Sequence, residues 1–170
     1  MTSELRPPGP IRVLFVCTGN SARSVMAEAL LRTKGGAAFD VHSAGTDPRG
    51  INPLTVRVLT DAGIDASGAR SKSVTGYLGQ HFDYVVTVCD EARQVCPVFP
   101  GVHQPLHWSY EDPAEAQGTE VERLAVFRRV FVQLGERINQ FVPVALRARL
   151  GRAEADSTTA ESRPATLKKT

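Results

Sequence analysis

This chain of 170 residues has little net charge, no long apolar run and few cysteines, and each of these absences excludes a class of protein. Its formal net charge is only +2, which excludes the strongly basic surface that nucleic-acid binding requires. No apolar run approaches the length of a membrane span, and the N-terminal "MTSELRPPGP" has no apolar signal core. Three cysteines, a small and odd number, exclude a disulfide scaffold. We therefore expect a cytoplasmic protein with reduced thiols and without membrane or nucleic-acid partners.

Four apolar segments have the character of short strands. They lie at residues 11–16, 39–45, 82–88 and 102–108. Helices are predicted at residues 24–34, at 52–63 with Asn52 as N-cap, and after a capping box of Thr119 and Glu122. Alternating strands and helices predict an α/β domain with a mostly parallel sheet, which binds ligands beyond the carboxyl ends of its strands.

The same pattern sets the extent of the domain. Pro-rich residues 1–10 predict a flexible N-terminal arm, and the domain proper spans 11–142. Its last helix has apolar residues at helical spacing: Val121, Leu124, Phe127 or Arg128, Phe131, Leu134, Ile138 and Phe141. We expect Pro143 to break or kink this helix. Residues 143–170 form a C-terminal extension, predicted to be disordered beyond 151 because it lacks apolar periodicity.

The segment "CTGNSARS", residues 17–24, joins the first strand to the first helix. Gly19 and Asn20 tolerate left-handed backbone, and such a loop turns its N–H groups inward to hold an anion beside the positive end of a helix. Arg23 adds a planar fork of donors, and Cys17 at the rim is expected to have a lowered thiol pKa. The spacing disfavours the alternative, a buried structural cysteine. The predicted oxyanion-binding residues are Thr18, Gly19, Asn20, Ser21, Ala22, Arg23 and Ser24, with Ser24 also bonded to the Cys17 thiolate.

The stretch "FVCTGNSARSVMAEALL" resembles the signature loop of low-molecular-weight protein tyrosine phosphatases and of the arsenate reductases that share their fold. The resemblance covers about residues 11–142 and includes "HSAG" at 42–45. It implies a flavodoxin-like three-layer α/β fold of low-molecular-weight phosphatase type, with a four-stranded parallel sheet in the order 2-1-3-4. The loop by itself does not distinguish a phosphatase from a reductase.

Two further cysteines, Cys89 and Cys96, follow the third predicted strand. If that strand lies beside the first, the strand ends are about 4.8 Å apart, and Cys17 and Cys89 can bridge after a modest loop movement. A helical segment would separate Cys89 from Cys96 by roughly 10 Å, so a bond between these two requires the segment to unwind. The alternatives are cysteines that fill the core, or a zinc site with His103 and His107, for which the cysteine spacing is unusual.

The three cysteines resemble those of thioredoxin-coupled arsenate reductases, and this resemblance implies a relay. Cys17 attacks arsenate, Cys89 attacks Cys17 and arsenite leaves, and Cys96 attacks Cys89 to leave a Cys89–Cys96 disulfide for thioredoxin. Thioredoxin reductase returns thioredoxin to its dithiol form, no metal or organic cofactor is implied, and we expect a monomer. The rival functions are a phosphatase for tyrosine or small phosphomonoesters and a non-enzymatic oxyanion-binding module.

Asp112 precedes Pro113, which restrains it to extended backbone. The family's general acid stands at such an Asp-Pro, so the resemblance implies that Asp112 protonates the leaving oxygen. The alternatives are a plain turn aspartate, and Glu111 as a substitute acid. Phosphatases of the family carry tyrosines after Asp-Pro, whereas this chain has "AEA" at 114–116, which resembles the reductases.

Some reductases of this family bind potassium beside the catalytic loop, and their ligands match Asn20, Glu28 and Ser43 here. A further carboxylate is expected near "ARSKSV", but Lys72 stands at that place. A lysine repels a metal cation and can replace its charge. The sequence therefore predicts no tight potassium site.

Overall fold

The computed structural model describes residues 9–101 and 104–161, and its centre is a four-stranded parallel sheet. The strand order β2-β1-β3-β4 confirms the predicted topology and fold class. Two strands are shorter than predicted, and the predicted residues 102 and 103 lie outside the described residues. The strands are β1 (Ile11–Cys17), β2 (Phe39–Gly45), β3 (Tyr84–Thr87) and β4 (Gln104–His107).

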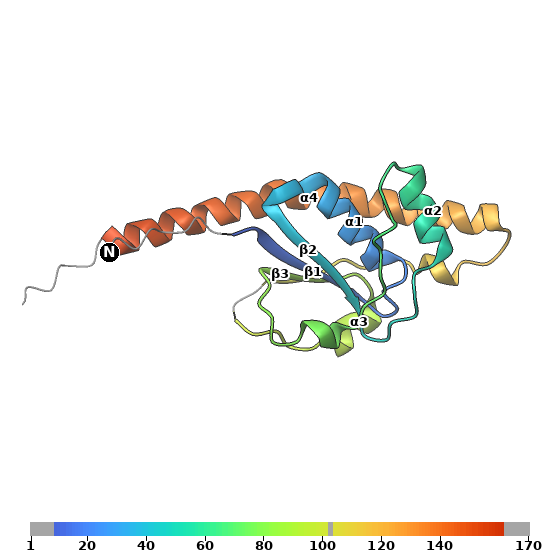
Figure 1. Cartoon of the computed structure of the whole chain (residues 1–170), viewed down its shortest axis with the longest axis horizontal. Helices are drawn as coiled ribbons and strands as arrows, with labels where there is room; N and C mark the ends of the chain where they lie inside the picture. The colour runs from blue at the N-terminus through green and yellow to red at the C-terminus, as the bar shows by residue number, and fades with distance from the viewer. Residues whose placement is uncertain (1–8, 102–103, 162–170) are drawn as a thin grey trace, which may run out of the picture.

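Helices cover both faces of this sheet and make three layers (Figure 1). On one face lie α1 (Arg23–Gly35), α2 (Pro53–Asp61) and α4 (Glu120–Glu161), whereas α3 (Asp90–Val95) lies on the other. Short 3₁₀ turns complete the chain: η1 (Gly36–Ala38), η2 (Val74–Tyr77) and η3 (Pro113–Glu115). Both predicted helix caps are present. At the start of α2 the Asn52 side chain accepts a hydrogen bond from the Leu54 N–H. Thr119 and Glu122 exchange both bonds of a capping box.

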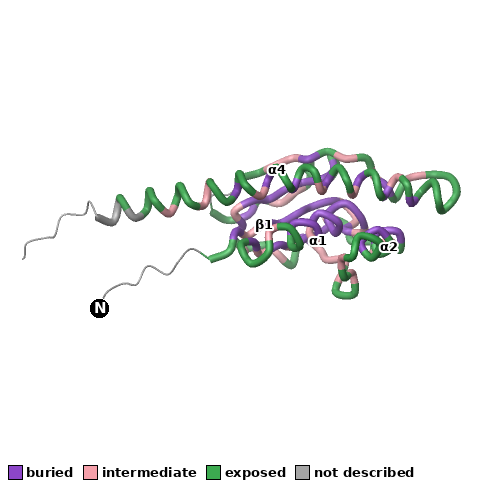
Figure 2. The backbone as a smooth tube through the Cα atoms, turned by 90° about the horizontal axis from the view of Figure 1, so that it is seen from above, coloured by how far each residue is buried: buried purple, intermediate pink, exposed green. Residues whose placement is uncertain are grey.

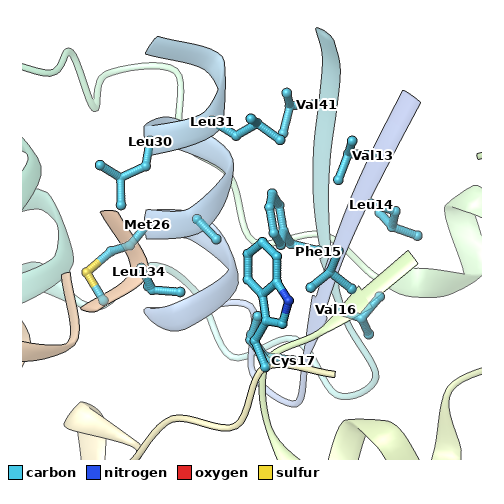
Figure 3. Close-up of a cluster of buried hydrophobic side chains, with 14 of the residues drawn as sticks. Val13, Leu14, Phe15, Val16, Cys17, Met26, Leu30, Leu31, Val41 and Leu134 are labelled. Atoms are coloured by element: carbon cyan, nitrogen blue, oxygen red, sulfur yellow. The ribbon is translucent and has the colours of Figure 1, made fainter. Parts of the chain in front are cut away.

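The core forms where β1 is buried on both faces. Figure 3 shows Phe15 on the side of α1, while Leu14 and Val16 point away from that helix. Phe15, Met26 and Leu134 are fully buried in this layer between β1, α1 and α4. Because β1 is central and tightly packed, its last residue, Cys17, is held at a fixed point on the carboxyl edge of the sheet.

The last helix differs from the prediction in two ways. Pro143, expected to break or kink the helix, does not break it, and residues 151–161, predicted to be disordered, form its last turns. Residues 162–170 of the same prediction lie outside the described residues. Packing explains the first difference, since Phe141 and Ala145 on either side of Pro143 are both buried against the domain. Beyond them the helix projects past the sheet and is mostly exposed (Figure 2). Within the described chain, no helix combines the length and apolar character that crossing a bilayer needs.

Candidate active site

The loop that follows β1 is held by the segment between β2 and α2. Four of its carbonyl oxygens accept backbone N–H donors at 2.9–3.1 Å: Cys17 from Thr46, Thr18 from Asp47, Gly19 from Arg49 and Ser21 from Asn52. A peptide N–H points away from the carbonyl of the same peptide group. Fixing the carbonyls on one side therefore turns the neighbouring N–H groups to the other, as the predicted anion-binding concavity requires.

Two backbone features permit this loop. Gly45, which pairs with Cys17 across the sheet, has no room for a side chain, because a Cβ there would lie 2.5 Å from the Thr18 carbonyl oxygen. Asn20 has the left-handed φ of 45° that the loop requires. Of the two loop residues that tolerate left-handed backbone, Gly19 and Asn20, only Asn20 adopts it.

The Cys17 sulfur is surrounded by hydrogen-bonding groups. Its Sγ accepts from the Asn20 N–H at 3.1 Å and lies 2.8 Å from the Ser24 Oγ, which confirms the predicted contact with Ser24. Burial is nevertheless the strongest influence and raises the pKa of the Cys17 thiol, while Ser24, Asn20 and the charge of Arg23 act in the opposite direction. The expectation of a lowered pKa is wrong for this arrangement, because the motif does not reveal how completely the sulfur is buried.

This balance predicts how alkylation of Cys17 depends on pH. A raised pKa keeps the thiol protonated at neutral pH, so the rate with iodoacetamide, followed at Cys17 by peptide mapping, should rise into the alkaline range. Ser24→Ala removes a stabilising hydrogen bond from the thiolate and should slow alkylation about tenfold at neutral pH. Ser71→Ala is the matched control, because Ser71 bonds the loop carbonyl of Gly19 and not the sulfur. Equal pH profiles for Ser24→Ala and the parent would contradict the assignment.

A chain of polar side chains continues from Ser24 into the protein. The Asn20 amide nitrogen donates to Ser24 Oγ at 2.8 Å and to Ser43 Oγ at 3.0 Å, and Ser43 donates to Glu28. Lys72 Nζ lies 3.4 Å from Glu28 Oε2, on the carboxylate that also accepts from Ser43. Arg32 Nη2 lies 2.7 Å from the other oxygen, Glu28 Oε1, so two cations that balance Glu28 belong to the chain itself.

We predict that potassium has no specific effect on this protein. Activity and melting temperature should be the same in potassium and sodium at equal ionic strength, because Lys72 and Arg32 already pair with the two oxygens of Glu28. Lys72→Met should lower the free energy of unfolding by about 1–2 kcal/mol, since it leaves a largely buried carboxylate with one partner fewer. A clear gain of the parent protein in potassium over sodium would contradict this prediction.

Arg23 and Asp112 meet at the mouth of the loop. Arg23 Nη2 lies 2.9 Å from Asp112 Oδ2, and its Nη1 donates to the Tyr110 carbonyl at 3.1 Å. These contacts aim the guanidinium of a largely buried side chain. Asp112 has the extended backbone predicted from Pro113, and its other oxygen accepts from the Ala114 N–H at 3.0 Å. The structure thus places the predicted acid beside the predicted oxyanion-binding arginine.

A polar cavity of about 270 Å³ opens at this point. Arg49, Asp90 and Glu91 belong to its lining, although no sequence signal selected them. Arg49 is brought there by its backbone bond to Gly19, and the two acids begin α3. The cavity is lined by Thr18, Arg23, Arg49, Asp90, Glu91, Tyr110, Asp112 and Glu115.

The second and third cysteines lie at opposite ends of α3. Cys89 is the residue before the helix and Cys96 the residue after it, and all three cysteines are free thiols. Because the Val88 N–H donates to the Val16 carbonyl at 2.9 Å, pairing of β1 and β3 continues to the edge of the loop. Cys89 is buried there, with its Sγ 3.5 Å from the Thr18 Oγ1.

Cys96 is set apart from the loop. It is half-buried, and burial raises its thiol pKa. It lines a second, mostly apolar cavity of about 360 Å³ together with Val85, Pro97 and Leu106. Among the described residues no three His, Cys, Asp or Glu side chains are grouped to hold a metal ion, and His103 of the alternative zinc site lies outside them.

A cysteine beside a loop of inward N–H groups and a buried arginine, at the carboxyl edge of a parallel sheet, defines an enzyme that attacks small oxyanions or their esters with a thiolate. A family model described as low molecular weight phosphotyrosine protein phosphatase matches residues 12–154. The chain belongs to this family.

Individual relatives are named for two activities. An arsenate reductase of Halalkalibacterium halodurans is 44% identical over 129 residues, which cover 76% of this chain and 93% of the relative. The structure of a thioredoxin-dependent arsenate reductase of Corynebacterium glutamicum matches with a TM-score of 0.66 and 29% identity over 84% of this chain, which spans 65% of that one. A low molecular weight protein tyrosine phosphatase from T. tengcongensis matches with a TM-score of 0.64 and 26% identity, covering 78% of this chain and 98% of that one. The fold therefore does not separate the two activities.

Proposed function

We propose that this chain is an arsenate reductase that passes electrons from thioredoxin to arsenate through Cys17, Cys89 and Cys96. The observation that carries the proposal is the placement of the second thiol: Cys89 Sγ lies 3.5 Å from the side chain of Thr18, the residue next to Cys17. A phosphatase needs one thiolate and has no use for a second in this position. The arsenate reductase that is 44% identical supports the same activity.

The first step begins when the Cys17 thiol gives its proton to an oxygen of the bound arsenate, and the resulting thiolate attacks arsenic. The N–H groups of residues 18–24 and the Arg23 guanidinium hold the arsenate oxygens, and Asn20 and Ser24 stabilise the sulfur until it attacks. Asp112 donates a proton to the departing oxygen, which leaves as water. The product is a Cys17–arsenic(V) thioester, and no electrons have yet moved.

The second step reduces arsenic. The Cys89 thiolate attacks the Cys17 sulfur, the sulfur–arsenic bond breaks, and its electron pair stays on arsenic, which leaves as arsenite. Cys96 then attacks Cys89 Sγ, releases the Cys17 thiolate and forms the Cys89–Cys96 disulfide. A dithiol thioredoxin reduces this bond and becomes a disulfide itself, so each turnover carries two electrons from thioredoxin to arsenic.

The proposal also covers the electron donor, the cofactors, the compartment and the oligomeric state. The electrons come from thioredoxin, and the chemistry at the three thiols requires no metal or organic cofactor. Free thiols at all three positions suit the reducing cytoplasm. A monomer suffices, because one chain contributes all the residues named in the relay.

The cavity favours this function over phosphotyrosine hydrolysis. A phosphotyrosine ring needs an apolar wall, whereas Tyr110 is the one aromatic residue among the eight that line the cavity, and four others are acidic. A small oxyanion without a ring requires no such wall. Weak hydrolysis of small phosphomonoesters remains compatible with the loop chemistry.

A coupled assay tests the proposal. NADPH consumption by thioredoxin reductase and thioredoxin should depend on both arsenate and this protein, with one NADPH used for each arsenite formed. Cys17→Ser should show no consumption above background. Turnover with a glutaredoxin or another small-thiol system but not with thioredoxin would contradict the choice of electron donor, and release of phosphate from phosphotyrosine at a comparable kcat/KM would contradict the choice of reaction.

A further inference from the structure

A histidine links the start of α3 to the sheet. His107, the last residue of β4, has its Nδ1 2.8 Å from Thr87 Oγ1 on β3 and its Nε2 2.8 Å from Asp90 Oδ1, the first residue of α3. Ser109 Oγ donates to the same Asp90 oxygen at 3.3 Å. Asp90 follows Cys89 directly in the chain, so the hydrogen bonds of His107 hold the backbone next to the first thiol of the Cys89–Cys96 pair.

The bonds of this histidine do not depend on its charge. Neutral His107 protonated on Nε2 donates to Asp90 and accepts the Thr87 hydroxyl proton at Nδ1. Doubly protonated His107 donates to both, and Thr87 then donates to the Leu106 carbonyl, which lies 3.4 Å away. The hydrogen bond from His107 is also the main influence that lowers the pKa of Asp90, so Asp90 is a carboxylate at neutral pH.

Helix α3 has to change shape when its two flanking cysteines bond. Seven residues of helix span roughly 10 Å, whereas a disulfide needs Cα atoms within about 7 Å. Closing the Cys89–Cys96 bond therefore unwinds residues 90–95 and displaces Asp90. The contact with His107 belongs to the dithiol form, in which α3 is helical.

We propose that Thr87, His107 and Asp90 form a restraint that stabilises the dithiol form of the Cys89–Cys96 pair and so raises its reduction potential. The inference rests on the relay described under the proposed function, and it assigns positioning roles to residues that take part in none of its bond exchanges. A contact present in only one of two states shifts their equilibrium by its own free energy. The restraint makes the disulfide easier for thioredoxin to reduce.

The test is the reduction potential of the full chain in a Cys17→Ser background, where Cys89 and Cys96 are the remaining thiols. Equilibration with mixtures of reduced and oxidised dithiothreitol, read by mass of the alkylated protein, gives the potential. Asp90→Ala should favour the disulfide about three- to tenfold, which is a potential about 15–30 mV more negative. Thr87→Val, which keeps the side-chain shape but removes the hydroxyl, should shift it in the same direction, and Thr87→Ser should restore it.

Asp61→Ala is the matched control. Asp61 is also an exposed aspartate with hydrogen bonds to basic side chains, Arg57 and Arg128, but it joins α2 to α4. Its loss should leave the potential unchanged. Equal potentials for the parent and Asp90→Ala, or an equal shift in Asp61→Ala, would overturn the restraint while leaving the relay intact. Failure of the Cys17→Ser protein to form any Cys89–Cys96 disulfide would overturn the relay itself and the restraint with it.

Discussion

Cys96→Ser is expected to abolish steady-state arsenate reduction, with kcat in the thioredoxin-coupled assay falling to background. The third thiol stands at the far end of α3 and lines a separate cavity, so it does not touch the oxyanion loop. Its loss leaves arsenate binding and the first two steps intact. The variant should therefore release one arsenite per protein in a single burst and then stop, with Cys17 and Cys89 joined in a disulfide.

Two companion variants make this result specific. Cys89→Ser should release no arsenite at all, because the thiol beside Thr18 is the one that breaks the sulfur–arsenic bond. Both variants should keep whatever slow hydrolysis of p-nitrophenyl phosphate the parent shows, since that reaction uses Cys17 alone. Sustained turnover by Cys96→Ser with thioredoxin would show that Cys96 is dispensable and that the relay ends at Cys89.

Arg23→Lys should lower kcat/KM for arsenate by about 10²–10³-fold. The guanidinium is held from two sides, with Nη2 at Asp112 and Nη1 at the Tyr110 carbonyl. In the proposed complex its planar fork would bond two oxygens of the tetrahedral anion at once. A lysine keeps the charge but loses this geometry and frees Asp112. The loss should appear in kcat as well as in KM, because the arginine aligns the oxyanion with Cys17 and orients the acid.

Arg49→Lys is the control for this substitution. Arg49 lines the same cavity but is mostly exposed and is paired with Asp47 across 3.2 Å. Its exchange for lysine should change kcat/KM less than about threefold, because exposed ion pairs contribute little. Similar losses in Arg23→Lys and Arg49→Lys would mean that general positive charge, and not a positioned fork, binds the anion.

The sequence predicts the sheet and the loop well because both depend on local signals. Buried β-branched runs define β1 and β3. The residues between Cys17 and Ser24 define a strand–loop–helix unit, and in a parallel sheet ligands bind beyond the carboxyl ends of the strands, where this loop lies. The contact of Ser24 with the Cys17 sulfur and the extended backbone of Asp112 follow from short-range rules and are confirmed.

Features that depend on packing between residues far apart in the sequence could not be predicted from such local signals. Pro143 does not end α4 because Phe141 and Ala145 are buried on both sides of it. The same helix buries Val130, which the predicted apolar stripe omits, and exposes Val121, which the stripe includes. The pKa of Cys17 depends on total burial, and Arg49 enters the site through a bond between two loops.

Transfer of electrons to arsenate by three thiols of one chain can be measured without any reductant. Fully reduced protein is mixed with excess arsenate, arsenite is counted, and disulfides are mapped in peptides after trapping of free thiols. We expect one arsenite per protein, a Cys89–Cys96 disulfide and a free thiol at Cys17. Three intact thiols and no arsenite would contradict it.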